Sequence, residues 1–224
     1  AAVQSITGQV PKFPEAERLY FLSAIRYVNQ VKLASGTIQP DSLPEMAGYQ
    51  PNIWVTDDCH ANSAKEAHAR SRGIAYHVLG GERKPGLPEP ATMPSAPGRK
   101  KVVVTGCYDW FHSGHVRFFE EVSTHGDLYV IVGHDANIRL LKGEGHPLVP
   151  EDERRYVVGS IKYVKQALIS SGEGWLDADP EILRLKPDIY AVNEDGDKGG
   201  KREYCAERGI EYLVLKRTPA PGLP

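Results

Sequence analysis

The sequence predicts an α/β protein in which helices flank a parallel sheet. Short apolar runs of strand length alternate with segments of helical periodicity through much of the chain. The apolar run at 101–105 leads through a glycine turn into a helix that opens near Ser113. A further succession of helices and strands occurs twice in the chain, because residues 11–88 match residues 147–224. Strands that alternate with helices of this length favour a parallel sheet with helices on both faces.

The most informative stretch is residues 101–122. Three consecutive valines, Val102–Val104, make a short buried strand that Gly106 ends. Apolar residues at 116, 118–119 and 122 then return at helical spacing. Such a turn directs backbone N–H groups and the positive end of a helix dipole at whatever lies before it, so it predicts a phosphate site. A second apolar strand is expected at 127–133.

The two matching stretches align without a gap at an offset of 136 positions. Glu17 falls on Glu153, and Ile25 falls on Ile161. In all, 28 of the 78 aligned positions are identical, which is far above chance and indicates an internal duplication.

Both copies predict the same succession of elements. A helix begins after a proline, a β-rich run follows, and a second helix begins near an aspartate. A strand, a helix that ends at a glycine, and a last strand complete the copy. The first helix is expected to begin after Pro14 or Pro150, the β-rich run at 30–33 or 166–169, and the second helix near Asp41 or Asp177. The next strand is expected at 53–56 or 189–192, the end of the following helix at Gly73 or Gly209, and the last strand at 76–79 or 212–215.

Three segments follow from this pattern. Residues 1–84 form a partial repeat, since only ten residues precede the first copy. Residues 85–99 are rich in proline and predict a stiff, exposed linker. Residues 100–224 hold the fuller copy with its two upstream strands. We expect a preceding half-domain either to lie outside the chain or to have been lost, and the first copy to pack against the second.

Composition excludes several classes of function. The chain has 224 residues and a net charge of −2, from 27 basic and 29 acidic residues, so it does not favour nucleic acid. No apolar run approaches the roughly 18 residues that span a membrane, and no signal peptide is visible. Cys59, Cys107 and Cys205 are odd in number and lack zinc-site spacing. A reduced, cytoplasmic protein is the expectation.

The string Gly106-x-Tyr108-Asp109-x-Phe111-His112-Ser113-Gly114-His115 resembles the cytidylyltransferase-like nucleotidyltransferases. The likeness is greatest to the branch that acts on phosphoethanolamine, phosphocholine and glycerol 3-phosphate. The duplication is similar to the tandem domains of ethanolamine-phosphate cytidylyltransferases.

The resemblance implies a Rossmann-like nucleotidyltransferase fold with a duplicated, degenerate partial copy. It implies transfer of CMP from CTP to a phosphorylated alcohol, first of all phosphoethanolamine, with release of pyrophosphate. Mg²⁺ would enter with CTP, since it prefers phosphate oxygens and water to a dedicated protein cage. The expected partners are therefore the nucleotide and the small acceptor, and a homodimer is among the assemblies that the family allows.

The resemblance also assigns roles to particular residues. Imidazoles and cations would neutralise charge on the transferring phosphoryl group, and backbone near the turn would hold the nucleotide. The candidate catalytic residues are His112, His115, Lys142 and Arg217. The candidate nucleotide-binding residues are Gly106, Cys107, Tyr108, Asp109, Gly114 and Thr218. The candidate acceptor-binding residues are Arg154, Asn193, Glu194 and Asp195.

Structural roles stay open for several of these residues. Lys142 also fits a solvated loop, and Asp109 also fits a turn. Arg154 has a counterpart, Arg18, in the first copy, which favours helix packing as well as phosphate binding. The segment 193–197 also fits a plain turn.

The end of the sequence departs from the family pattern. Arg217 and Thr218 resemble the residues that precede a Ser/Thr-rich helix start, which holds the triphosphate in this family, yet the sequence stops at Pro224. We expect that segment beyond Pro224 in a longer parent protein. The equivalent first-copy stretch, 88–92, lacks the motif, which predicts a first copy that does not bind nucleotide.

Two other functions stay open from the sequence. One is an adenylyltransferase of the same superfold, which uses ATP and a phosphorylated acceptor. The other is a non-catalytic interaction or dimerisation module. A dinucleotide-dependent oxidoreductase is disfavoured, because no Gly-x-Gly-x-x-Gly follows the first strand.

Overall fold

The computed structural model describes residues 2–34, 38–46, 48–80 and 87–216. The chain divides into two compact units. The smaller unit holds Ala1–Pro14 and Lys32–Pro85, and the larger unit holds Glu15–Val31 and Gly86–Pro224.

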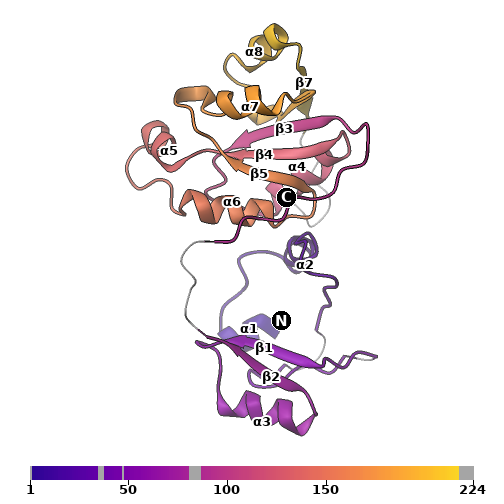
Figure 1. Cartoon of the computed structure of the whole chain (residues 1–224). Coiled ribbons are helices and arrows are strands. Elements are labelled where there is room, and N and C mark those ends of the chain that lie inside the picture. The colour runs from indigo at the N-terminus through magenta and orange to yellow at the C-terminus, as the bar shows by residue number, and fades with distance from the viewer. Residues whose placement is uncertain (1, 35–37, 47, 81–86, 217–224) are drawn as a thin grey trace. The chain divides into compact units, whose positions relative to one another are not determined.

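The larger unit is built on a five-stranded, entirely parallel sheet in the order β5-β4-β3-β6-β7 (Figure 1). The chain winds from β3 outward to β5, then crosses to β6 and β7 on the other side. This confirms the predicted parallel α/β fold of the Rossmann-like type. The strands are β3 (Lys101–Gly106), β4 (Asp127–Val132), β5 (Val164–Ile169), β6 (Ile189–Asn193) and β7 (Glu211–Leu215).

Six α-helices and two short 3₁₀ helices complete the larger unit in its described residues. The helices are α2 (Glu15–Ser23), α4 (Ser113–Ser123), α5 (Asp135–Lys142), α6 (Glu151–Gly159), α7 (Asp179–Leu185), α8 (Lys201–Arg208), η1 (Gly174–Leu176) and η2 (Glu194–Gly196).

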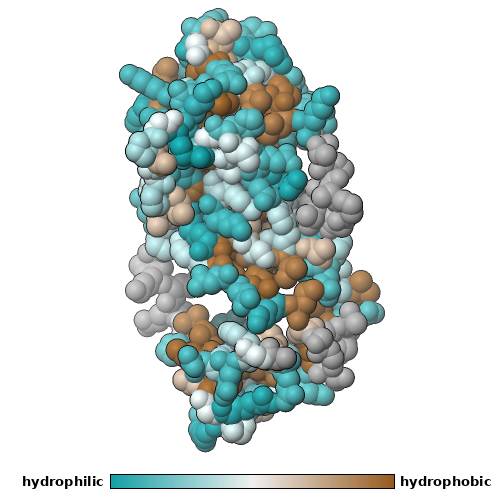
Figure 2. Space-filling model, turned by 90° about the vertical axis from the view of Figure 1, so that its right-hand side faces the viewer, coloured by the Kyte–Doolittle hydropathy of each residue, from teal (hydrophilic) through white to brown (hydrophobic). Residues whose placement is uncertain are grey.

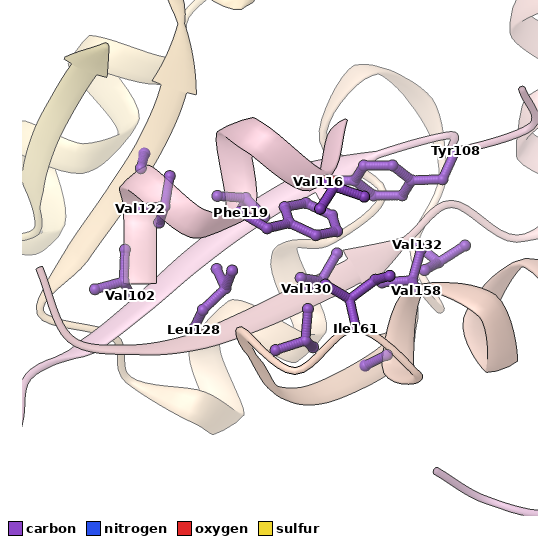
Figure 3. Packing of buried hydrophobic residues seen from close by; sticks show 14 of the residues in the cluster. Val102, Tyr108, Val116, Phe119, Val122, Leu128, Val130, Val132, Val158 and Ile161 are labelled. Atoms are coloured by element: carbon purple, nitrogen blue, oxygen red, sulfur yellow. The ribbon is translucent and has the colours of Figure 1, made fainter. Parts of the chain in front are cut away.

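The core has two layers because successive residues of β3 point to opposite faces of the sheet. Val102 and Val104 belong to one buried cluster and Val103 to the other. Val116, Phe119 and Val122 of α4 pack onto the first face, with Val122 near Val102 (Figure 3). Each such buried side chain contributes about 1.5–3 kcal/mol. This packing fixes where the start of α4 lies relative to the end of β3.

The smaller unit contains α1 (Ala2–Thr7), β1 (Ile53–Asp57), α3 (Ser63–Ser71) and β2 (Ala75–Leu79). β1 and β2 pair in parallel, and the side chain of Asn62 caps α3 by accepting the Lys65 N–H at 2.9 Å. At the offset of 136, the residue ranges of β1, β2 and α2 coincide with those of β6, β7 and α6. Ile53 pairs with Ala75 as Ile189 pairs with Glu211. The duplication itself remains an inference from the sequence.

Two expected elements of the first copy are absent from its described residues. Residues 30–33 form no strand, and the helix expected near Asp41 is not formed through residue 46. The counterpart of the missing strand, β5, is held by hydrogen bonds to β4. No strand equivalent to β4 is described in the smaller unit, so the β-rich run has no partner to pair with.

The compact units also differ from the expected boundaries. Residues 15–31 join the larger unit, although the sequence places them in the first repeat. The described part of the expected linker, from residue 87, is not a free spacer. Pro90 is buried, and a Cβ on Gly159 would lie 2.5 Å from its ring. Met93 donates its N–H to the Lys165 carbonyl at 3.2 Å.

The face shown in Figure 2 is mainly hydrophilic, with apolar residues in separate patches. None of the helices in the described part of the chain has the length and apolarity that crossing a bilayer requires.

Candidate active site

A cleft of about 590 Å³ opens at the carboxyl ends of β3 and β6, where the winding of the sheet reverses. This is the position at which open α/β sheets bind ligands. The lining residues are Thr105, Gly106, Cys107, Tyr108, Asp109, Trp110, His112, His115, Phe118, Lys142, His146, Leu148, Ala191, Val192, Asn193, Asp195, Gly196 and Lys201.

The floor of the cleft depends on a close packing of Gly106 and Tyr108. Tyr108 has a φ of 53°, a left-handed conformation that residues with side chains seldom adopt. Its ring turns back under the strand end, so a Cβ on Gly106 would lie 2.8 Å from the ring carbon Cζ. Tyr108 is only 7% exposed. Gly106 is therefore required by the turn that brings Cys107 and Asp109 to the cleft.

The two histidines cap α4 reciprocally. Nδ1 of His112 accepts the Gly114 N–H at 3.0 Å, and Nδ1 of His115 accepts the His112 N–H at 3.3 Å. Two imidazoles thus take the places that Ser or Thr and Glu or Gln hold in a common capping box. Because each Nδ1 accepts a hydrogen bond, each neutral ring carries its proton on Nε2. Both histidines line the cleft.

His115 is a neutral donor rather than a cation. Burial and the neighbouring His112 lower the pKa of His115 to about 4, although Asp195 acts in the opposite direction. Phe111 stacks on the ring with centroids 5.3 Å apart and planes 12° apart. This stacking holds the imidazole in place at the helix start.

Two lysines bring positive charge to the same cleft from different helices. Lys142 is the last residue of α5, and Lys201 is the first residue of α8. The ammonium group of Lys201 donates to the Gly196 carbonyl at 2.8 Å. Burial lowers the pKa of Lys201, Asp197 opposes this, and Lys198 adds to it.

The comparisons with known proteins address the same part of the chain. The sequence model of the cytidylyltransferase-like family matches residues 103–218. The chain belongs to the cytidylyltransferase-like family. That stretch contains both histidines, both lysines and every other lining residue of the cleft.

Two relatives and one solved structure are similar to parts of this chain. An FAD synthase of Ferroglobus placidus is 40% identical over 120 residues, which are 52% of this chain and 75% of that protein. A bifunctional protein HldE of Pelobacter propionicus is 36% identical over 101 residues, 45% of this chain but 20% of that protein. A solved lipopolysaccharide core biosynthesis protein from Thermoplasma volcanium has a TM-score of 0.45 at 23% identity, covering 54% of this chain and 98% of that one.

In this family member, Asp109 holds the loop that follows α5. Its Oδ1 accepts the N–H groups of Leu148 at 2.6 Å and Val149 at 3.0 Å, and Oδ2 lies 3.1 Å from Nδ1 of His146. Burial raises the pKa of Asp109, but these hydrogen bonds and Arg154 outweigh it, so the pKa stays below its usual value. Asp109 thereby holds His146 and Leu148 at the cleft.

Arg154 does not lie where the predicted contact with the acceptor would require it. Its side chain is 1% exposed and is absent from the cleft lining. The guanidinium donates to the carbonyls of Val149, Cys107 and Gly133, and pairs with Asp135 at 2.6 Å. Arg154 ties the turn after β3 to the start of α5 and α6, so its role is positional. This is the structural alternative that Arg18 suggested.

The remaining sequence-predicted residues fall into three groups. His112, His115, Lys142, Gly106, Cys107, Tyr108, Asp109, Asn193 and Asp195 line the cleft together. Gly114 donates its N–H to the cap, and Glu194 is exposed; neither lines the cleft. Arg217 and Thr218 lie outside the described residues.

Sequence reasoning missed five lining side chains that have distinct chemistry. They are Trp110, Phe118, His146, Leu148 and Lys201. Lys201 could have been found, because Gly199 and Gly200 before a helix start at the end of β6 are typical of a ligand loop. Trp110 lines the cleft and is 57% exposed.

Metal ligands are sparse around the cleft. In the ranges that the structure describes, no group of three or more His, Cys, Asp or Glu residues could hold a metal ion. Both carboxylate oxygens of Asp109 already accept hydrogen bonds or contact His146. Asp195 would offer a single oxygen ligand to a Mg²⁺ ion that arrived on nucleotide phosphates.

Proposed function

We propose that this nucleotidyltransferase joins the AMP group of ATP to the phosphate of a phosphorylated acceptor and releases pyrophosphate. The observation that carries the proposal is the reciprocal histidine cap of α4. It places two imidazoles at a cleft that Lys142 and Lys201 also line.

The chemistry needs no general base. A phosphate monoester is largely ionised at neutral pH, since its second pKa is about 6. One of its oxygens attacks the α-phosphorus, a new P–O bond forms, and the bond to the β-phosphate oxygen breaks as pyrophosphate leaves with its electron pair. The enzyme has to align the reactants and neutralise the developing charge.

The residues of the cleft match those tasks. His112 and His115 would donate hydrogen bonds to phosphate oxygens, and the dipole of α4 would act in the same direction. Lys142 of α5 and Lys201 of α8 would supply positive charge. Mg²⁺, when bound with the nucleotide, would reduce the repulsion among the phosphate charges, and Asp195 would offer it an oxygen ligand.

The names of the relatives favour ATP as the nucleotide. Several are FAD synthases, and FAD is FMN joined to AMP through a pyrophosphate bond. FMN is therefore the first acceptor to test. The exposed ring of Trp110 at the cleft agrees with an acceptor that carries a planar aromatic group.

CMP transfer from CTP to phosphoethanolamine is the second candidate. The carboxylate of Asp195 at the cleft favours it, because ethanolamine carries a positive charge. The family description is also cytidylyltransferase-like. The ATP and CTP reactions share the histidine cap and differ in the base and acceptor.

The test is pyrophosphate release with Mg²⁺ in four combinations: ATP or CTP, each with FMN or phosphoethanolamine. We expect ATP with FMN to give the highest kcat/KM. Calorimetric titration of each nucleotide alone reports base preference separately from turnover. Binding of neither nucleotide, together with no pyrophosphate in any combination, would favour the non-catalytic module.

A further inference from the structure

Helix α2 lies far from the histidines in the sequence but packs beside them in the larger unit. We propose that α2 positions the histidine cap of α4, with Glu17 and Phe21 as its positioning residues. Residues 15–31 would then be part of the active-site architecture, although the sequence assigns them to the first repeat. The kinetic test of this proposal rests on the function proposed above, whereas the NMR test of the His115 pKa does not.

Glu17 holds the first residue of α4. The hydroxyl of Ser113 donates to the Glu17 carboxylate, and Ser113 is 2% exposed. Ser113 directly follows His112, the N-cap residue. A hydrogen bond to a carboxylate from a buried hydroxyl is among the stronger kinds. Glu17 therefore restrains the backbone from which both histidines project.

Phe21 restrains the ring of His115 through one intermediate. Its ring meets that of Phe111 edge to face, with centroids 5.9 Å apart. Phe111 in turn stacks on His115. Aromatic pairs of this geometry contribute about 0.5–1.5 kcal/mol beyond the area they bury. Phe21 thus packs against the ring on which His115 stacks.

The far end of α4 is held by the same helix. The hydroxyl of Tyr20 donates to Oε2 of Glu120 at 2.6 Å, while Tyr163 donates to Oε1 at 2.8 Å. Two phenols from separate segments thus meet one carboxylate of α4, and α2 contacts α4 at both ends.

The anchorage of α2 has local two-fold character. The N–H of Arg26 donates to the Ser160 carbonyl at 2.8 Å, and the N–H of Lys162 donates to the Ala24 carbonyl at 2.8 Å. Between them, Ile25 and Ile161 form an antiparallel bridge. At the offset of 136, Ala24, Ile25 and Arg26 correspond to Ser160, Ile161 and Lys162.

A contact in which equivalent residues exchange equivalent hydrogen bonds is the pattern of an isologous interface between two like subunits. In this chain it forms within one polypeptide. Residues 15–31 therefore occupy the place that a second copy would take on a symmetric partner, and they bring Glu17 and Phe21 to the histidine helix.

Three variants of the full chain test the proposal. Phe21→Leu keeps an apolar side chain but removes the aromatic edge. Glu17→Ala and Ser113→Ala remove one partner each, and their combination completes a double-mutant cycle. Leu22→Ala and Glu15→Ala, both exposed on α2, are the matched controls.

The first readout does not depend on activity. The pKa of His115 is followed by NMR of the imidazole, with His112 and Asp195 as the titratable neighbours that influence it. In Phe21→Leu we expect this pKa to rise from about 4 toward the ordinary value near 6.5, because the ring stack loosens. Leu22→Ala should leave it unchanged.

The second readout is kinetic. Glu17→Ala and Ser113→Ala should each lower kcat about 10-fold with KM for the nucleotide changed less than about twofold, and the double variant should fall no further. Thermal unfolding confirms that each variant is folded. An unchanged His115 pKa in Phe21→Leu, or additive losses in the cycle, would overturn the proposal. A wild-type chain that releases no pyrophosphate would contradict the proposed function alone, since the NMR readout would still decide the role of α2.

Discussion

At the residue scale, the protonation state of His115 decides what the histidine cap can do. A pKa of about 4 leaves the ring uncharged at neutral pH, so it acts through its Nε2–H dipole. The two lysines at the cleft, Lys142 and Lys201, then supply positive charge to it. The sequence predicted both histidines from their spacing, but it could not show that their Nδ1 atoms are used by the helix cap, because that depends on the ring orientation.

This pKa makes stability depend on pH. Between about pH 6.5 and pH 4 the unfolded chain binds a proton at His115 and the folded chain does not, so the free energy of unfolding falls as the pH falls. By pH 4, the protonation of His115 in the unfolded chain lowers the free energy of unfolding by about 3 kcal/mol. Urea unfolding at pH 7, 5.5 and 4.5 measures it, and His115→Gln should show a shallower decline. Parallel curves for the two proteins would contradict the shifted pKa.

Gly106 gives a second prediction at this scale. In Gly106→Ala the new methyl group would meet the Tyr108 ring at 2.8 Å, so the turn must shift. We expect a loss of about 1–3 kcal/mol in the free energy of unfolding, together with reduced nucleotide affinity. Gly80→Ala is the control, because nothing lies within 4 Å of its added Cβ. Equal stability of the two variants would show that the turn tolerates a side chain.

At the scale of elements, the site is assembled by side chains that lie behind it. Asp109 holds the loop after α5, and Arg154 joins the turn after β3 to that helix. The sequence predicted the strand–turn–helix unit well, because its valine run and helical periodicity are local signals. It misplaced Arg154, since a buried arginine and a phosphate-binding arginine have the same neighbours in sequence.

Arg154 should therefore behave as a structural residue. In Arg154→Ala the carbonyls of Cys107 and Gly133 lose their donor and Asp135 loses its ion pair. We expect the free energy of unfolding to drop by about 3–5 kcal/mol. The adjacent Arg155→Ala removes a pair with the exposed Glu89 and should cost less than about 1 kcal/mol. A stable Arg154→Ala protein with only a raised KM would instead restore the substrate-contact role.

At the scale of the whole molecule, the fold class followed from the sequence, but the division into units did not. The repeat at an offset of 136 anticipated like elements at α2, β1 and β2, which match α6, β6 and β7, but the described residues hold no first-copy counterpart of β5 or α7. It could not show that residues 15–31 pack with the larger unit, because that choice depends on long-range contacts such as those of Arg26 with Ser160. The predicted β-rich run at 30–33 forms no strand, because a strand needs a neighbour with which to pair and the described smaller unit offers none there.

The central claim is that the two imidazoles at the start of α4, with His115 uncharged, stabilise nucleotidyl transfer. His115→Gln tests it most cleanly, because glutamine at this position can still complete the capping box. The measurement is the rate of pyrophosphate release at saturating nucleotide, acceptor and Mg²⁺, compared with wild type. We predict a fall in kcat of about 100- to 1000-fold with a melting temperature close to that of wild type. A folded His115→Gln protein that turns over at the wild-type rate would contradict the account.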